Sequence, residues 1–141
     1  MPVYRYPRPA LTVDALVYVR KNNSYYILLV QRGQEPYKGK WALPGGFVNI
    51  DELLVDACIR ELREETGLIV RSMEQYRTFD AVDRDPRGRT ISVVYYTELD
   101  ERQEVRGGDD AAHAKWHLLT NLPPLGFDHK NILKMFFRDK L

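Results

Sequence analysis

The 141-residue sequence is poor in cysteine, in long apolar runs and in any excess of charge of one sign. Its single cysteine, Cys58, cannot form an internal disulfide, and its apolar neighbours at helical spacing favour a packing role. No apolar run approaches the roughly 18 residues of a membrane span, and the N-terminus lacks the apolar core of a signal peptide. We therefore expect no membrane partner and a cytoplasmic location.

Charge is balanced, with 21 lysines and arginines against 20 acidic residues and a net charge of +1. Such a chain has no general field that attracts a nucleic-acid backbone, so we expect no nucleic-acid partner and only local binding of anions. The hydrophobic share of 44% supplies a core, but the length is too short for two full-sized domains. The sequence predicts a single domain over residues 1–141.

Two periodicities alternate along the chain. Helical spacing runs from Asn49 to Glu65, with Asn49 and Glu52 as a capping box and Gly67 as the stop, and it returns after Asp128. Strand signals cover 11–19, 25–30, 69–79, 91–99 and 116–119, and turn or loop signals cover 21–24, 33–40, 83–88 and 107–110. Strands interrupted by one helix and closed by another predict an α/β protein of the α+β type, a sheet covered by helices.

The first predicted helix carries three acids on one side. Measured from Glu52 at about 100° per residue, Glu61, Glu64 and Glu65 fall within a sector of about 100°. Their mutual repulsion calls for a positive charge, and hard oxygen donors suit Mg²⁺ or Mn²⁺. Magnesium usually shares its shell with substrate phosphates, so the cluster predicts a phosphate-bearing substrate attacked by a metal-activated water.

The alternative is an ordinary solvated helix face whose acids pair with arginines, as Arg60 can pair with Glu64 one turn away. The wider spacing decides between the two. Seven fixed positions would match by chance on the order of 10⁻⁹ per starting point. Together they make a complete Nudix box over residues 46–68, with Gly46, Glu52, Arg60, Glu61, Glu64, Glu65 and Gly67 in place. The sequence therefore resembles the Nudix hydrolases.

This resemblance implies the Nudix fold, a mixed β-sheet sandwiched between helices, and hydrolysis of a nucleoside diphosphate linked to another group. It implies Mg²⁺ or Mn²⁺ as the cofactor and a possible homodimer. Carried over by position, the metal ligands are Glu61, Glu64, Glu65 and the carbonyl of Gly46. Glu52 and Arg60 are supporting residues of the same catalytic box.

Four further segments resemble the ADP-ribose pyrophosphatase branch of the family: 35–48, 85–89, 108–111 and 127–129. They imply that ADP-ribose is cut to AMP and ribose 5-phosphate. The alternatives are a nucleoside triphosphate, a dinucleoside polyphosphate or a nucleotide sugar as substrate, or a non-catalytic sensor of an ADP-ribose-like ligand. Regulators of this branch carry an added winged helix-turn-helix domain, for which we expect no room in 141 residues. The acidic triad also favours catalysis.

Substrate contacts are predicted from side-chain chemistry. Arg32 and either Arg87 or Arg89 can offer fork-shaped donors to phosphate oxygens. Tyr37 and Phe79 are candidates for stacking on adenine, and for Phe79, as for Trp41, a place in the core is the alternative.

Two further pairs of residues complete the candidates. Asp109 and Asp110 lie in a glycine-containing loop, where either can be a general base or an additional metal ligand, or both can belong to an ordinary acidic turn. His113 and His117 have no third ligand in a recognisable pattern, so a zinc site is not predicted.

Overall fold

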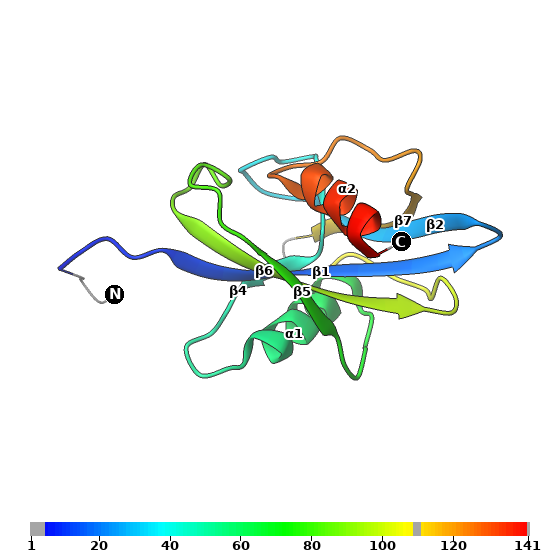
Figure 1. Ribbon diagram of the computed structural model, residues 1–141, viewed down its shortest axis with the longest axis horizontal. Coiled ribbons are helices and arrows are strands. Elements are labelled where there is room, and N and C mark those ends of the chain that lie inside the picture. Colours follow the sequence, from blue (N-terminus) through cyan, green and yellow to red (C-terminus); the bar gives the residue numbers. More distant parts are fainter. Residues whose placement is uncertain (1–4, 109–110, 141) are drawn as a thin grey trace.

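The computed structural model describes residues 5–108 and 111–140. Its elements, in chain order, are β1 (Ala10–Lys21), β2 (Ser24–Arg32), β3 (Trp41–Ala42), β4 (Gly45–Phe47), α1 (Leu54–Thr66), β5 (Glu74–Phe79), β6 (Thr90–Leu99), β7 (Ala111–Leu118) and α2 (His129–Lys140). The segment that precedes β1 extends away from the sheet (Figure 1), and Tyr6 within it is 70% exposed.

Seven strands form one mixed sheet with the order β3-β2-β1-β6-β5, to which β4 adds by pairing with β1 and β7 by pairing with β2. The central pair β1–β6 is parallel and the other pairs are antiparallel. Every residue of β1 from 12 to 19 is buried, as expected for a central strand that is covered on both faces.

Helices α1 and α2 cover opposite faces of this sheet (Figure 1). Because side chains alternate along a strand, Val13 and Val17 of β1 pack with Leu62 of α1. Leu16, on the other face of β1, packs with Phe136 of α2. The predicted mixed sheet between helices is confirmed. In the described ranges, neither helix has the length and apolar character that a membrane crossing requires.

Helix α1 begins later than predicted, with Leu53 rather than Asn49 at its N-cap. The backbone N–H of Asn49 does donate to Glu52 Oε1 at 2.9 Å, as in a capping box, but within a turn that precedes the helix. The reason is the contact between Glu52 and Arg60, with Oε1 and Nη2 2.6 Å apart. Two residues eight positions apart in one helix lie about 12 Å apart along its axis, so this contact requires Glu52 to lie off the helix.

Two strands also differ from their predicted bounds. The strand predicted over 69–79 is shorter, because its first part connects α1 to the sheet, with Met73 buried against the α1 side of the core. Strand β7 is longer than the predicted 116–119, since it pairs with β2 from Ala111 to Leu118. Its first residues carry little strand propensity, so backbone pairing with β2 determines their conformation.

Candidate active site

A cleft of about 360 Å³ opens where β4, the C-terminal half of α1, the 80–89 loop and the start of α2 meet. Residues from segments far apart in the sequence line it together. They include Asp14, Arg32, Gly46, Phe47, Glu61, Glu65, Arg84, Arg87, Phe127 and His129.

Glu61 and Glu65 form a carboxyl pair on the wall of this cleft, where they are hydrogen-bonded to each other. The backbone of Gly45 adds a hydrogen bond to Glu65. Gly46 lies directly against the pair, because a Cβ added at position 46 would stand 2.6 Å from Cδ of Glu61 and 2.7 Å from both of its oxygens. Only a residue without a side chain allows this approach.

The two carboxyls are strongly perturbed. Burial, followed by the charge of Glu61, raises the pKa of Glu65 from 4.5 to about 9. Burial also raises the pKa of Glu61, although Arg60 acts in the opposite direction. Two acids this close in a site with little water cannot both ionise freely, so the pair holds a proton at neutral pH in the absence of a cation.

We expect this proton to produce a measurable pH dependence of stability. The folded state keeps the proton on Glu65 up to about pH 9, whereas an unfolded chain releases it near 4.5. The folded state therefore binds more protons between these values, and the contribution of Glu65 to the free energy of unfolding falls as pH rises through this window. Thermal unfolding in a chelator from pH 5 to 9 measures the effect.

The matched control for that experiment is Glu65→Gln, which cannot titrate at this position and should have a flatter profile. Because a cation must displace the shared proton, calorimetry in buffers of different ionisation enthalpy should also detect proton release when Mg²⁺ binds at pH 7. Identical pH profiles for the parent and the variant would contradict the assignment.

Arg60 forms ion pairs with three acids of the box. Its Nη2 lies 2.6 Å from Glu52 Oε1, and its Nη1 lies 2.9 Å from Glu61 Oε1 and 3.1 Å from Glu64 Oε2. Nη2 also donates to the carbonyl of Phe47 at 3.2 Å. Hydrogen bonding to Arg60 is the main cause that lowers the pKa of Glu52. Arg60 thus connects the turn before α1, strand β4 and the acidic side of the helix.

The three predicted carboxylate ligands do not form one cluster in this structure. Among the described residues, no three acidic, histidine or cysteine side chains are grouped so as to hold an ion. Glu64 shares Arg60 with Glu61, whereas Glu65 pairs with Glu61 alone. The physical reason is that Arg60 provides the positive charge that the clustered acids require.

The donor set nevertheless fits a divalent cation. Glu61, Glu65 and the main chain of Gly46 bring hard oxygen atoms together at one wall of the cleft, and the raised pKa of the carboxyl pair reflects its need for a positive charge. Glu64 has a side chain that is 34% exposed, so it can complete the set by turning its carboxylate from Arg60 towards the pair.

Two of the predicted phosphate-binding arginines line the cleft. The guanidinium of Arg32 lies 5.0 Å from the ring centre of Phe127, and that of Arg87 lies 5.7 Å from the same ring and 5.2 Å from Phe47. Arg87 is oriented by Asp85, which accepts hydrogen bonds from its Nη2 at 2.8 Å and from its backbone N–H at 2.9 Å. Cations and aromatic faces therefore alternate along one side of the cleft.

The other predicted substrate residues do not line the cleft. Arg89 donates to the carbonyl of Asp80 at 2.5 Å, and Tyr37 packs edge-on against Phe127 at 4.8 Å between ring centres. Phe79 is only 8% exposed and packs in the core beneath α2, which is the alternative that the sequence left open.

Trp41 also packs against that core, with its ring 4.6 Å from the ring of His117. Asp109 and Asp110 lie outside the described residues.

Sequence reasoning missed several residues of the cleft, namely Asp14, Phe47, Arg84, Phe127 and His129. Phe47, Phe127 and His129 lie in the segments 35–48 and 127–129 that carried the family resemblance, although none of them was assigned a role, and Asp14 had a signal of its own. Asp14 is a charged residue inside the otherwise apolar 11–19 segment, and a buried carboxylate requires polar partners. The partners themselves come from distant segments, and nothing in the sequence pairs them with Asp14.

Comparison with known proteins shows the family of the chain. A family model described as NUDIX domain matches residues 8–136. The chain is 43% identical over 135 residues to a protein of Methanocaldococcus jannaschii named ADP-ribose pyrophosphatase, and the match covers 96% of this chain and 77% of that protein.

ADP-ribose also appears in the descriptions of two further relatives. An Acinetobacter baylyi protein named ADPR responsive transcriptional repressor NtrR is 34% identical over 136 residues. The match covers 94% of this chain and 54% of that protein. The solved NUDIX domain of Shewanella oneidensis NrtR, complexed with ADP ribose, superposes with a TM-score of 0.89 at 30% identity, covering 96% of this chain and 91% of that one.

Proposed function

The chain belongs to the NUDIX domain family, and on that premise we propose that it hydrolyses ADP-ribose to AMP and ribose 5-phosphate with Mg²⁺ or Mn²⁺ as cofactor. Enzymes of this family are pyrophosphohydrolases that generally use divalent metal ions. The observation that carries the proposal is the partly buried pair Glu61–Glu65 against Gly46, in a cleft that also presents Arg32 and Arg87.

In this proposal Glu61, Glu65 and the carbonyl of Gly46 hold the cation, and Glu64 joins them. The cation, when bound, polarises the pyrophosphate and lowers the pKa of a water for attack on phosphorus. Arg60 keeps Glu61 and Glu64 in place through its hydrogen bonds, and Glu52 orients Arg60 in turn.

The opposite side of the cleft is suited to the rest of a nucleoside diphosphate. Arg87 and Arg32 supply planar guanidinium groups that match phosphate oxygens. Phe47 is 48% exposed, so its ring is a candidate for stacking on a base, and Phe127 lies next to it across Arg87. The chemistry of this side is therefore complementary to an anionic group that carries an aromatic base.

The direct test incubates the protein with ADP-ribose and Mg²⁺ in ¹⁸O-labelled water and analyses the products. We expect AMP and ribose 5-phosphate, with the label in one of them identifying the phosphorus that is attacked. A panel with a nucleoside triphosphate, a dinucleoside polyphosphate and a nucleotide sugar should rank ADP-ribose first by kcat/KM. A different leading substrate would overturn the substrate assignment but not the site.

A second candidate is a sensor that binds ADP-ribose without cutting it, which the similarity to the NtrR repressor favours. The carboxyl pair Glu61–Glu65 argues for the enzyme, since a pure binder has no need of a water-activating metal. Tight binding of ADP-ribose with no turnover in Mg²⁺ or Mn²⁺ would favour the sensor. The cytoplasmic location and the homodimer stay predictions.

Replacing Arg87 should separate binding from chemistry. Arg87→Met keeps an unbranched side chain but removes the charged guanidinium that lies over the two phenylalanine rings. Because a hydrogen bond to a charged group contributes about 1.5–3 kcal/mol, we expect KM for ADP-ribose to rise about tenfold or more while kcat changes little. Steady-state kinetics measures both. Arg89→Met is the matched control, and an equal rise in KM for both variants would contradict the assignment.

A further inference from the structure

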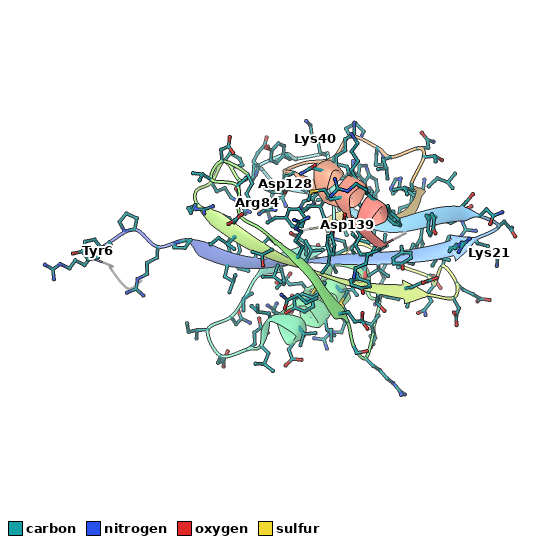
Figure 2. All side chains as sticks on the ribbon, viewed as in Figure 1. Tyr6, Lys21, Lys40, Arg84, Asp128 and Asp139 are labelled. Atoms are coloured by element: carbon teal, nitrogen blue, oxygen red, sulfur yellow. The ribbon has the colours of Figure 1, made fainter. Side chains whose placement is uncertain are left out.

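A buried polar network joins the start of α2 to two walls of the cleft, and neither the metal site nor the phosphate contacts account for it. Nδ1 of His129 accepts the backbone N–H of Leu43 at 2.9 Å, and its Nε2 lies 3.6 Å from Oδ1 of Asp14. The neighbouring Asp128 accepts two hydrogen bonds from Arg84, from Nε at 3.0 Å and from Nη2 at 2.7 Å. Figure 2 shows Arg84 and Asp128 side by side near the start of α2.

Apart from Asp128, whose side chain is 21% exposed, the members of this network are almost out of contact with water. The side chains of Arg84 and His129 are 3% and 4% exposed, and that of Asp14 is 10% exposed. Asp14 also accepts a hydrogen bond from the hydroxyl of Ser92 at 2.5 Å. Burying such groups is costly, and apolar residues could fill the same space at no loss of stability. A network of this kind is therefore better explained by the geometry that it imposes.

One part of this network, which we call its first arm, is the contact of His129 with the segment that leads to the metal site. Leu43 is followed by Pro44, Gly45 and Gly46, and the carbonyl of Pro44 accepts the N–H of Ala15 at 2.7 Å. His129 and β1 thus hold this segment at two successive residues. Because Gly46 lies directly against the carboxylate of Glu61, a shift of the segment moves the backbone relative to the carboxyl pair.

The other part, its second arm, is the contact of Asp128 with Arg84 in the 80–89 loop. Arg84 anchors that loop to Asp128, and the next residue, Asp85, is the one that orients Arg87. Asp85 is itself only 5% exposed, so two successive residues of the loop, Arg84 and Asp85, are buried. The position of Arg87 in the cleft therefore depends on the pair between Arg84 and Asp128.

We propose that Asp128 and His129 are positioning residues with separate tasks: His129 sets the metal-binding segment 43–46, and Asp128 sets the 80–89 loop that carries Arg87. This inference rests on the proposed function for what the two segments bind, but the two arms are defined by contacts alone. Asp128 and His129, which are adjacent at the start of α2, thereby fix the positions of the two halves of the site relative to each other.

The protonation states are those that the network requires. Burial lowers the pKa of His129 and outweighs the opposing effect of Asp14 and Asp128, so its Nδ1 is free to accept the N–H of Leu43. For Arg84, burial acts to lower the pKa, but the hydrogen bonds to Asp128 and the charge of Asp14 raise it. Arg84 therefore stays charged between its two carboxylates.

The test compares His129→Leu with His129→Asn, and Asp128→Asn with Arg84→Met. Asparagine can place an oxygen where Nδ1 stands, whereas leucine removes the acceptor. The first readouts need no substrate: Mn²⁺ binding by electron paramagnetic resonance, and amide hydrogen exchange of peptides covering 41–47 and 81–89. Values of kcat and KM for ADP-ribose follow.

We expect His129→Leu to weaken Mn²⁺ binding on the order of tenfold and to speed exchange in 41–47 only, and His129→Asn to restore most of both. Asp128→Asn and Arg84→Met should leave Mn²⁺ binding nearly unchanged, speed exchange in 81–89, and raise KM about tenfold. If His129→Leu does not fold, His129→Gln replaces it, since glutamine places its acceptor at the other position.

Two results would overturn the inference. One is an equal effect of all variants on both peptides, which marks a general loss of packing. The other is an asparagine variant that is no better than leucine or glutamine at position 129. Failure of the proposed function is distinguishable, because it would appear as a parent protein that binds Mn²⁺ with a protected 41–47 segment yet does not cut ADP-ribose.

Discussion

Glu65→Gln lowers kcat for ADP-ribose by roughly 10³-fold, because a metal centre contributes several kcal/mol to a phosphoryl transition state and each 1.36 kcal/mol is tenfold in rate. Glutamine keeps the size of the side chain but is a poor ligand for a hard cation. It also removes a carboxyl whose pKa is raised to about 9 by burial and by Glu61, so the fold of the variant should be intact. Steady-state kinetics together with thermal unfolding separates loss of chemistry from loss of structure.

Glu64→Gln tests whether the fourth donor joins the site. Glu64 is bound to Arg60 and is more exposed than Glu61, so its role depends on a turn of the side chain towards the cation. We expect a large loss of turnover here too. The matched control is Asp56→Asn, an exposed acid on the same helix, which should leave kcat unchanged. Undiminished turnover in both glutamine variants would refute the metal assignment.

Much of α1 follows from its sequence. The period of 3.6 residues places Cys58 and Leu62 against the sheet, where both are fully buried. The stop at Gly67 is confirmed, since its φ of 77° is the left-handed conformation that glycine favours, and its N–H bonds the carbonyl of Arg63 at 2.8 Å. The predicted start of the helix at Asn49 was wrong. The contact with Arg60 determines the position of Glu52, and local helix propensity does not describe such a contact.

Long-range contacts account for what the sequence could not predict at the site. Leu43 and His129 are 86 residues apart, and Ser92 and Asp14 are 78 apart. The charge of Asp14 in an apolar strand signals that partners exist but not which residues they are. Such pairs are created by the order of strands in the sheet, which is fixed only when the whole chain has folded.

The predicted phosphate-binding arginines also show which part of the site the sequence predicts and which part depends on tertiary structure. A turn with Pro86 and Gly88 was predicted, and Arg87 in it lines the cleft. Its aromatic neighbours Phe47 and Phe127 come from β4 and from the turn before α2, and only the folded structure brings the three together. Side-chain chemistry therefore predicted the kind of donor, whereas tertiary structure selected Arg87 over Arg89.

Gly46→Ala should abolish tight metal binding with little loss of stability, and we expect kcat to fall by about 10²-fold, the size seen when one electrostatic contact of a transition state is lost. Among the described glycines, positive φ occurs at Gly39, Gly67 and Gly88, so alanine at position 46 meets no left-handed backbone. Its methyl group would instead stand 2.6 Å from Cδ of Glu61, and the carboxylate must move. Mn²⁺ titration and kinetics measure the loss.

Gly39→Ala is the opposite case and serves as the control. At position 39 an added Cβ meets no atom within 4 Å, but φ is 87°, which an alanine adopts at a cost of roughly 1 kcal/mol or more. That variant should therefore lose stability and keep its affinity for Mn²⁺, whereas Gly46→Ala should keep stability and lose affinity. If Gly46→Ala instead bound Mn²⁺ like the parent, the close approach of Gly46 to Glu61 would be a packing detail, and the cation would have to bind elsewhere on the acidic face of α1.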